Sequence, residues 1–133
     1  MSTRLVVCDD EVHITRTVSM KLSKAGYDVE TASDGQAALE AIQRELPALV
    51  ITDCQMPRMG GIELCRRLRE QPETANLPII LLTAKGFELD EAELKSELGL
   101  SHLICKPFSP RELLKTVQKT LAAIEVPSRG EQN

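Results

Sequence analysis

Short apolar runs alternate with amphipathic stretches along this chain. Four of the runs cover residues 5–8, 49–52, 79–82 and 103–105, and none is longer than four residues. Runs of this length, separated by helical stretches, are typical of parallel strands that are covered on both faces. Residues 28–32 alternate enough to form a further strand, nearer an edge. The sequence therefore predicts an α/β domain of five βα units with right-handed crossovers.

Helical periodicity fills the segments between these runs. Ile14, Val18 and Leu22 recur on one face of a helix predicted over about residues 11–25. An acidic helix is expected over about residues 88–98, and Ser109 is placed to cap the last helix. Residues 126–133 show no periodicity. The sequence thus predicts one domain over residues 1–125 and a flexible C-terminal tail over 126–133, too short to be an output domain.

Composition narrows the classes of function. No apolar run approaches the roughly 20 residues that a membrane span needs, and the first strand begins too early for a signal peptide. The cytoplasm is therefore the expected compartment. A formal net charge of −4 and only three aromatic residues argue against direct binding of nucleic acid, which calls for basic surfaces or stacking rings.

Polar residues follow four of the predicted strands. Asp9 and Asp10 follow the first, Asp53 the third, and Thr83 and Lys106 the last two. Ligands of open parallel sheets bind at the carboxyl ends of the strands. Carboxylates about 4 Å apart repel each other by roughly 4 kcal/mol, which protonation or a bound cation relieves. Mg²⁺ takes carboxylate, carbonyl and water oxygens, so the sequence predicts a phosphoryl and magnesium site.

Each of these residues also has a simpler explanation. Acidic residues such as Asp9, Asp10 and Glu11 favour the start of a helix, but that preference does not explain Asp53, which precedes a loop. A lysine is usually solvated, yet Lys106 ends a buried strand, where an ammonium group needs anionic partners. One shared pocket accounts for all of them together.

The motifs in this order resemble the receiver domain of two-component response regulators, of the stand-alone chemotaxis type. The match extends over about residues 4–124 and rests on four motifs: Asp9-Asp10, Asp53-x-x-Met56-Pro57-x-Met59-x-Gly61, Thr83-Ala84 and Lys106-Pro107-Phe108. The resemblance implies a flavodoxin-like fold, a five-stranded parallel sheet of order 2-1-3-4-5 with helices on both faces.

The resemblance also implies a mechanism. Asp53 would attack a phosphohistidine on a sensor histidine kinase or a histidine phosphotransfer protein and become an aspartyl phosphate. Asp10, Asp53 and the main-chain carbonyl of Gln55 would hold Mg²⁺, and Asp9 would act through water. Thr83 and Lys106 would contact the phosphoryl oxygens. The domain would catalyse only its own phosphorylation and dephosphorylation, and would not be an enzyme acting on other substrates.

Further family positions concern the peptide geometry and the switch. The resemblance implies a cis peptide between Lys106 and Pro107. Leu103 stands where the family usually has an aromatic residue that moves with the threonine. Gln55 and Lys85 occupy positions that line the entrance for hydrolytic water and would set the lifetime of the phosphorylated state. The alternative is that both are ordinary polar loop residues.

The last two predicted helices carry opposite charge. Residues 88–97 hold five acidic residues against one lysine, whereas Arg111, Lys115 and Lys119 recur along the last helix. A two-fold pair of copies could set one helix against the other, giving a homodimer through the last strand and last two helices. Docking of a downstream protein target is the other possible use. Two solvated faces that only aid solubility are the alternative.

Other classes remain open on the sequence alone. A magnesium-dependent phosphohydrolase of the haloacid dehalogenase type needs one spacer between its two aspartates, which Asp9-Asp10-Glu11 lacks. A flavin-binding module would have a Ser/Thr/Gly-rich loop after the first strand. An inactive receiver-like scaffold is disfavoured because every pocket position is filled.

Overall fold

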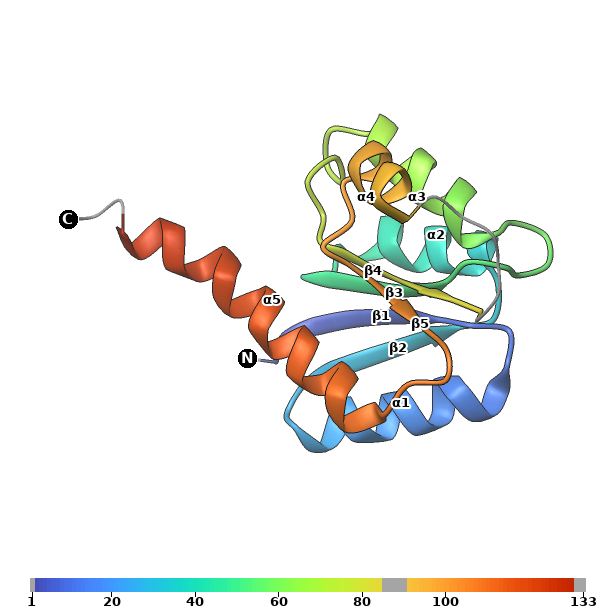
Figure 1. Cartoon of the computed structure of the whole chain (residues 1–133), viewed down its shortest axis with the longest axis horizontal. Coiled ribbons are helices and arrows are strands. Elements are labelled where there is room, and N and C mark those ends of the chain that lie inside the picture. Colours follow the sequence, from blue (N-terminus) through green and yellow to red (C-terminus); the bar gives the residue numbers. More distant parts are fainter. Residues whose placement is uncertain (1, 85–90, 131–133) are drawn as a thin grey trace.

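Strands and helices alternate without exception over the residues that the structure, a computed structural model, describes: 2–84 and 91–130, with the backbone alone for 125–130 (Figure 1). In chain order the elements are β1 (Arg4–Cys8), α1 (Val12–Lys24), β2 (Asp28–Ala32), α2 (Gly35–Arg44), β3 (Leu49–Asp53), α3 (Gly61–Glu70), β4 (Ile79–Thr83), α4 (Glu91–Leu98), β5 (His102–Cys105) and α5 (Pro110–Gly130).

All five strands are parallel and form one sheet in the order β2-β1-β3-β4-β5. This is the order that the resemblance to receiver domains implied. In the register of the sheet, Cys8 lies opposite Thr52, and Thr83 lies opposite Cys105. The carboxyl ends of β1, β3, β4 and β5 therefore meet along one edge, with β2 on the outside.

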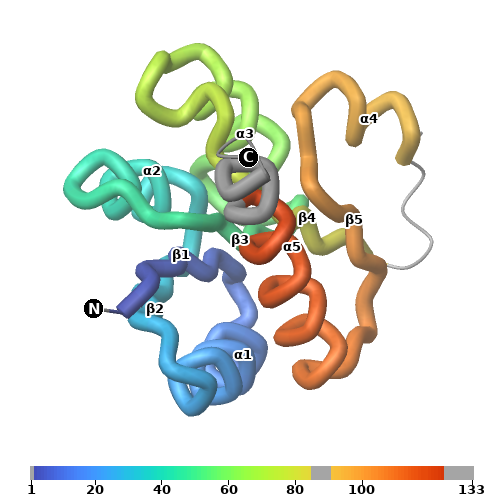
Figure 2. Tube along the Cα trace, turned by 90° about the vertical axis from the view of Figure 1, so that its left-hand side faces the viewer, coloured from blue at the N-terminus to red at the C-terminus, as the bar shows by residue number. Residues whose placement is uncertain are grey.

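The sheet separates two apolar layers. Helices α2, α3 and α4 cover one face, and α1 and α5 cover the other (Figures 1 and 2). All residues of β3 and β4 are buried, and successive side chains alternate between the layers. Val50 and Leu81 belong to the cluster under α2–α4, whereas Ile51 and Ile80 belong to the one under α1 and α5. This alternation explains why both strands are apolar up to the polar residues at their carboxyl ends.

Two predicted segments are described by the structure only in part. The acidic helix α4 begins at Glu91, and the earlier part of the predicted stretch lies outside the described residues. Residues 126–130, which the sequence assigned to a flexible tail, have helical backbone at the end of α5. The division between domain and tail stays a prediction. Among the described helices, none has the length and hydropathy to span a bilayer.

Candidate phosphoryl and metal site

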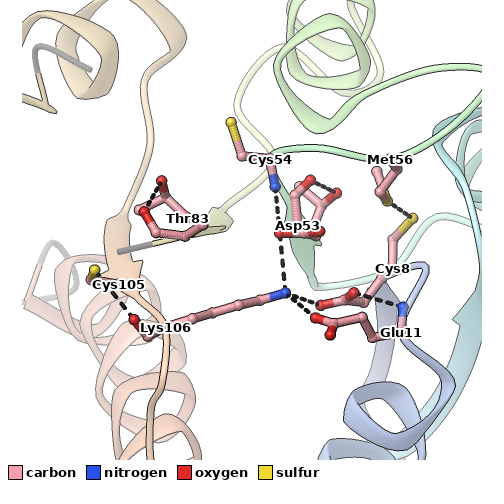
Figure 3. A network of polar contacts seen from close by, with 11 residues as sticks. Cys8, Glu11, Asp53, Cys54, Met56, Thr83, Cys105 and Lys106 are labelled. Atoms are coloured by element: carbon pink, nitrogen blue, oxygen red, sulfur yellow. Dashed lines mark hydrogen bonds and ion pairs between the residues drawn. The ribbon is translucent and has the colours of Figure 1, made fainter. Parts of the chain in front are cut away.

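The Lys106 ammonium group lies among carboxylates at the carboxyl edge of the sheet (Figure 3). Its Nζ is 2.9 Å from Asp9 Oδ2, 3.3 Å from Asp53 Oδ1 and 3.0 Å from Glu11 Oε1. Carboxylate oxygens of Asp9, Asp10 and Asp53 all lie within 4.8 Å of one another. The structure therefore brings together four of the residues that the sequence placed at strand ends, from three different strands.

Burial makes the charges of this cluster interact strongly. Asp9 and Asp53 expose 1% and 7% of their surface. Burial, and then the negative charge of Asp9, raise the pKa of Asp53 to about 6 despite the opposing effect of Lys106. Burial by itself would lower the pKa of Lys106, but hydrogen bonds to Asp9 and Glu11 and the charge of Asp53 outweigh it, so the pKa of Lys106 is raised. Lys106 thus stays protonated, and the raised pKa of Asp53 lets this carboxyl group titrate near pH 6.

Glu11 is a member of the site that the sequence analysis missed. It was noted only as an acidic residue at a helix start, yet its side chain contacts Lys106. Its main-chain N–H also donates to Asp9 Oδ1 at 2.9 Å, so the turn into α1 orients the Asp9 carboxylate. The only signal in the sequence was its place directly after Asp9 and Asp10.

The loop after β3 folds back over the strand end. The Cys54 N–H donates to Asp53 Oδ1 at 3.0 Å, and the Gly61 N–H donates to the Cys54 carbonyl at 2.9 Å. A Cβ at Gly61 would overlap the Asp53 carbonyl, so a side chain at that position would push the loop away from Asp53. Glycine at this position therefore lets α3 start directly behind the Asp53 carboxylate.

The other predicted site residues are placed as follows. Thr83 is buried at the end of β4, and its hydroxyl donates to the Ala84 carbonyl at 3.5 Å. The main chain at Lys106 donates to the Thr83 carbonyl at 2.7 Å, and the Lys106–Pro107 peptide is cis. Gln55 is exposed in the loop after β3. Leu103 is partly buried against the core cluster under α2–α4, and Lys85 lies outside the described residues.

The donor set fits a hard divalent cation. Carboxylates of Asp9, Asp10, Glu11 and Asp53 gather around a single ammonium group, which leaves the cluster with excess negative charge. Mg²⁺ prefers oxygen ligands and keeps several waters, so one or two carboxylates suffice to hold it. Lys106 takes one oxygen each from Asp9 and Asp53, and the Glu11 N–H takes the other oxygen of Asp9. The second oxygen of Asp53 and the carboxylate of Asp10 are therefore the natural donors.

Comparison with known proteins decides the family. A profile of the response regulator receiver domain matches residues 5–118. The chain belongs to this receiver domain family. Receiver domains are signalling domains of two-component systems, and they generally use Mg²⁺, in agreement with the acidic cluster described above. The family and the fold are therefore those that the sequence motifs predicted, and the phosphohydrolase and scaffold alternatives are not favoured.

Curated relatives contain the same domain within longer chains. This receiver domain is 41% identical over 126 residues to the alkaline phosphatase synthesis transcriptional regulatory protein PhoP of Bacillus subtilis, covering 95% of this chain and 51% of PhoP. It is 40% identical over 125 residues to the probable transcriptional regulator ycf27 of Cyanophora paradoxa, with coverage of 94% and 51%. The chain thus spans about half the length of these relatives.

Solved structures show the same arrangement. A putative response regulator from Chloroflexus aurantiacus superposes with a TM-score of 0.83 at 35% identity, covering 92% of this chain and 99% of that one. The chemotaxis protein CheY4 of Vibrio cholerae gives a TM-score of 0.82 at 33% identity, with coverage of 90% and 99%. Both confirm the receiver fold over nearly the whole of this chain.

Proposed function

We propose that Asp53 is the phosphoacceptor of this receiver domain and that it takes its phosphoryl group from a phosphohistidine of a sensor histidine kinase or histidine phosphotransfer protein. One observation supports this assignment above the others. Asp53 and Asp9 both belong to the acidic cluster and lie against the Lys106 ammonium, at 3.3 and 2.9 Å, but only the Asp53 side chain is exposed to a phosphoryl donor, 9% against 0%. A nucleophile beside a fixed cation is what transfer of a negatively charged group requires.

The transfer exchanges one bond to phosphorus for another. A carboxylate oxygen of Asp53 attacks the phosphorus atom, the bond between phosphorus and the histidine nitrogen breaks, and the electron pair leaves with the imidazole. The imidazole nitrogen takes up a proton and is restored as neutral histidine. Lys106 stabilises the phosphoryl oxygens as their charge shifts, and Asp9 and Glu11 hold Lys106 in place before the donor arrives.

When bound, Mg²⁺ would neutralise charge on the phosphoryl group as it passes from the imidazole nitrogen to the Asp53 oxygen. Asp10 and Asp53 would be its direct carboxylate ligands, the Gln55 main-chain carbonyl a third, and Asp9 would act through water. Thr83 would donate its hydroxyl to a phosphoryl oxygen, which requires it to leave its weak contact with the Ala84 carbonyl. Gln55 and Lys85 would limit access of hydrolytic water and so set the lifetime of the phosphorylated state.

Access for a donor is provided beside Lys106. A hollow of about 540 Å³ lies between α1 and the start of α5, and Ile14, Lys106, Pro107 and Phe108 are among its lining residues. Its lining is mainly apolar with Glu11 and His13 at its side, so a helix that carries the phosphohistidine has both apolar surface and charge to contact.

The four cysteines are free thiols, which suits the cytoplasm, a reducing compartment.

The output surface is proposed on α4, β5 and α5, which we call the α4–β5–α5 face. Lys115 and Lys119 are exposed on α5, whereas Glu97 of α4 pairs with Arg66 of α3 at 3.1 Å. Part of the negative charge of α4 is thus already used within the domain. A homodimer through this face, or docking of a downstream protein target, would be promoted by phosphorylation, with Leu103 repacking in place of the usual aromatic residue.

Stoichiometry of labelling separates this function from hydrolysis. Incubation with acetyl phosphate and Mg²⁺ should add one phosphoryl group per chain and then stop, as followed by intact-mass spectrometry. A phosphohydrolase would instead release phosphate from esters continuously. Sustained turnover of phosphate esters by the purified chain would refute the receiver function, whereas a single stoichiometric label supports it.

A further inference from the structure

The loop between β3 and α3, residues 54–60, is fastened to the start of α2. The Arg58 guanidinium donates from Nε and Nη2 to the same oxygen of Asp34, Oδ2, at 2.8 and 2.7 Å. Beside it the Gly35 N–H donates to the Met59 carbonyl at 2.9 Å. A Cβ at Gly35 would overlap that carbonyl, so the two backbones are as close as glycine permits. One ion pair and one main-chain bond therefore clamp the loop.

The clamp holds a conformation that the loop would otherwise avoid. Arg58 has a φ of 64°, in the left-handed region that is unfavourable for residues with a Cβ. Its partner Asp34 is 6% exposed and uses its second oxygen, Oδ1, to accept from the Ala37 N–H at 2.8 Å as the cap of α2. That hydrogen bond and the one from Arg58 lower the pKa of Asp34. The carboxylate is thus charged and fixed at neutral pH.

The clamped loop is continuous with the candidate metal site. It leaves directly from Asp53 and contains Gln55. Inside it, Met56 Sδ lies 3.2 Å from the thiol of Cys8, the residue before Asp9 (Figure 3). The same thiol lies 3.2 Å from the Asp34 carbonyl. The end of β1, the start of α2 and the loop are therefore joined on the side of the site away from Lys106.

We propose that Asp34 and Arg58 form a positioning pair for the metal site. The pair fixes the loop so that the Asp53 carboxylate and the Gln55 carbonyl present their oxygens to one cation. Neither residue is a ligand; both act through the loop. A loop that is ordered in advance loses less conformational entropy when the cation binds, so the pair raises affinity for Mg²⁺. This inference rests on the proposed function.

Arg58 allows a test in which charge and positioning act in opposite directions. Removing a positive charge near an acidic cluster should, by Coulomb's law alone, leave Mg²⁺ affinity unchanged or strengthen it. Loss of positioning should weaken it. Substitution by glycine is the sharpest choice because glycine accepts the left-handed φ of residue 58 without strain. Arg58→Gly removes the clamp and keeps the loop geometry accessible, so the variant should stay folded.

The measurement is a titration of the ¹⁵N-labelled protein with MgCl₂ alone, followed by the amide shifts of Cys54 and Gln55. Arg58→Gly should bind Mg²⁺ about tenfold more weakly than wild type, at the low end for partners outside the first ligand shell. The control is Arg67→Ala, which removes the same charge from an exposed ion pair on α3 and should bind as wild type. The side chain of the Asp34→Asn variant still caps α2 but carries no charge to pair with Arg58. Adding Arg58→Gly to Asp34→Asn should therefore cause no further loss of Mg²⁺ affinity.

Phosphorylation gives the second readout. The rate of labelling by acetyl phosphate should fall in Arg58→Gly at limiting Mg²⁺ and recover at saturating Mg²⁺, a dependence that a merely structural role would not produce. Mg²⁺ affinity in Arg58→Gly equal to or tighter than that of wild type would overturn the positioning role while leaving Asp53 labelling intact. Failure of the wild type to bind Mg²⁺ and to become labelled would overturn the proposed function itself.

Discussion

Lys106 Nζ and Asp53 Oδ1 stand 3.3 Å apart at the ends of two strands that are not neighbours in the sheet. The lysine side chain reaches past β4 to meet a carboxylate whose pKa is raised to about 6 by burial and by the nearby charge of Asp9. One ammonium group is thus shared among several acids. The cluster therefore carries excess negative charge, which a bound cation would offset.

The stability of the metal-free protein should depend on Asp53 between about pH 4 and 6. The pKa of Asp53 is about 6 in the folded state against an ordinary value of 3.8, so its protonated form favours folding. This contribution is complete below about pH 4 and is lost as the pH rises through about 6. The side chain of the Asp53→Asn variant has no proton to lose, so its contribution to stability does not change with pH. The melting temperature of Asp53→Asn should therefore exceed that of wild type by an amount that grows across this window.

Thermal melts in EDTA at a series of pH values measure this difference. Excess MgCl₂ serves as the control, because a ligand that binds only the folded state stabilises it, and wild type should gain more than the Asn variant. A difference in melting temperature that stays constant from pH 4 to pH 7 would contradict the raised pKa.

Removal of Lys106 should leave a buried negative charge without its partner. The Asp9 side chain is 0% exposed, and its Oδ2 lies 2.9 Å from Lys106 Nζ. Breaking a buried ion pair by removing one member typically costs about 3–5 kcal/mol, and we expect the lower end for Lys106→Met because Lys106 keeps 16% exposure. Urea unfolding in EDTA measures the loss. Mg²⁺ should restore part of it, since a cation replaces the missing charge; a loss that Mg²⁺ leaves untouched would argue against the shared site.

Arg69 of α3 should stabilise the fold although it is not part of the acidic cluster. Its guanidinium donates to three main-chain carbonyls at 2.7–3.0 Å, those of Leu98, Gly99 and Thr74, and so ties the end of α4 to the end of α3. Hydrogen bonds that involve a charged group contribute about 1.5–3 kcal/mol, and we expect Arg69→Ala to lose about 2 kcal/mol.

Arg67→Ala is the matched control, because Arg67 makes one half-exposed ion pair with Glu63 on the same helix. Such pairs contribute about 0–1 kcal/mol. Chemical denaturation of both variants at neutral pH compares them directly. Equal losses for the two would mean that the carbonyl contacts of Arg69 are not what anchors α4.

Phosphorylation should promote salt-sensitive association through the α4–β5–α5 face. Exposed charge pairs are individually weak, so the population of a pairing-competent state must shift on phosphorylation. Sedimentation with a stable phosphoryl mimic should show larger species at low salt than at high salt. The double change Lys115→Glu and Lys119→Glu should abolish the increase.

Arg16→Glu with Lys24→Glu provides the control, since it makes the same change of charge at exposed positions on α1. If neither pair of substitutions alters the mass distribution or the binding of a partner, the output surface lies elsewhere.

The sequence predicted the strands and the strand-end carboxylates because both depend on local patterns. A buried parallel strand must be apolar on both sides, as residues 49–52 and 79–82 are, and the topology of such a sheet brings Asp9, Asp53 and Lys106 to one edge.

What the sequence did not predict depends on side chains that meet only after packing. Glu11 contacts Lys106 because α1 starts beside the end of β5, and Arg69 reaches α4 because α3 and α4 lie together. Arg58 has a left-handed φ and pairs with Asp34, which is 24 residues away in the sequence. Long basic and acidic side chains have many rotamers, so sequence alone does not determine which partner they contact.

The most direct test of the account is to locate the phosphoryl group. Acetyl phosphate and Mg²⁺ should form an acyl phosphate, which borohydride reduces to a stable alcohol at the modified residue. Peptide mass spectrometry should then place the modification on Asp53 alone, and Asp53→Asn should remain unlabelled. A variant without the Asp10 carboxylate should be labelled poorly because it lacks a metal ligand. Undiminished labelling of Asp53→Asn, or a modification that maps to another carboxylate in the wild type, would contradict the assignment of Asp53 as the phosphoacceptor.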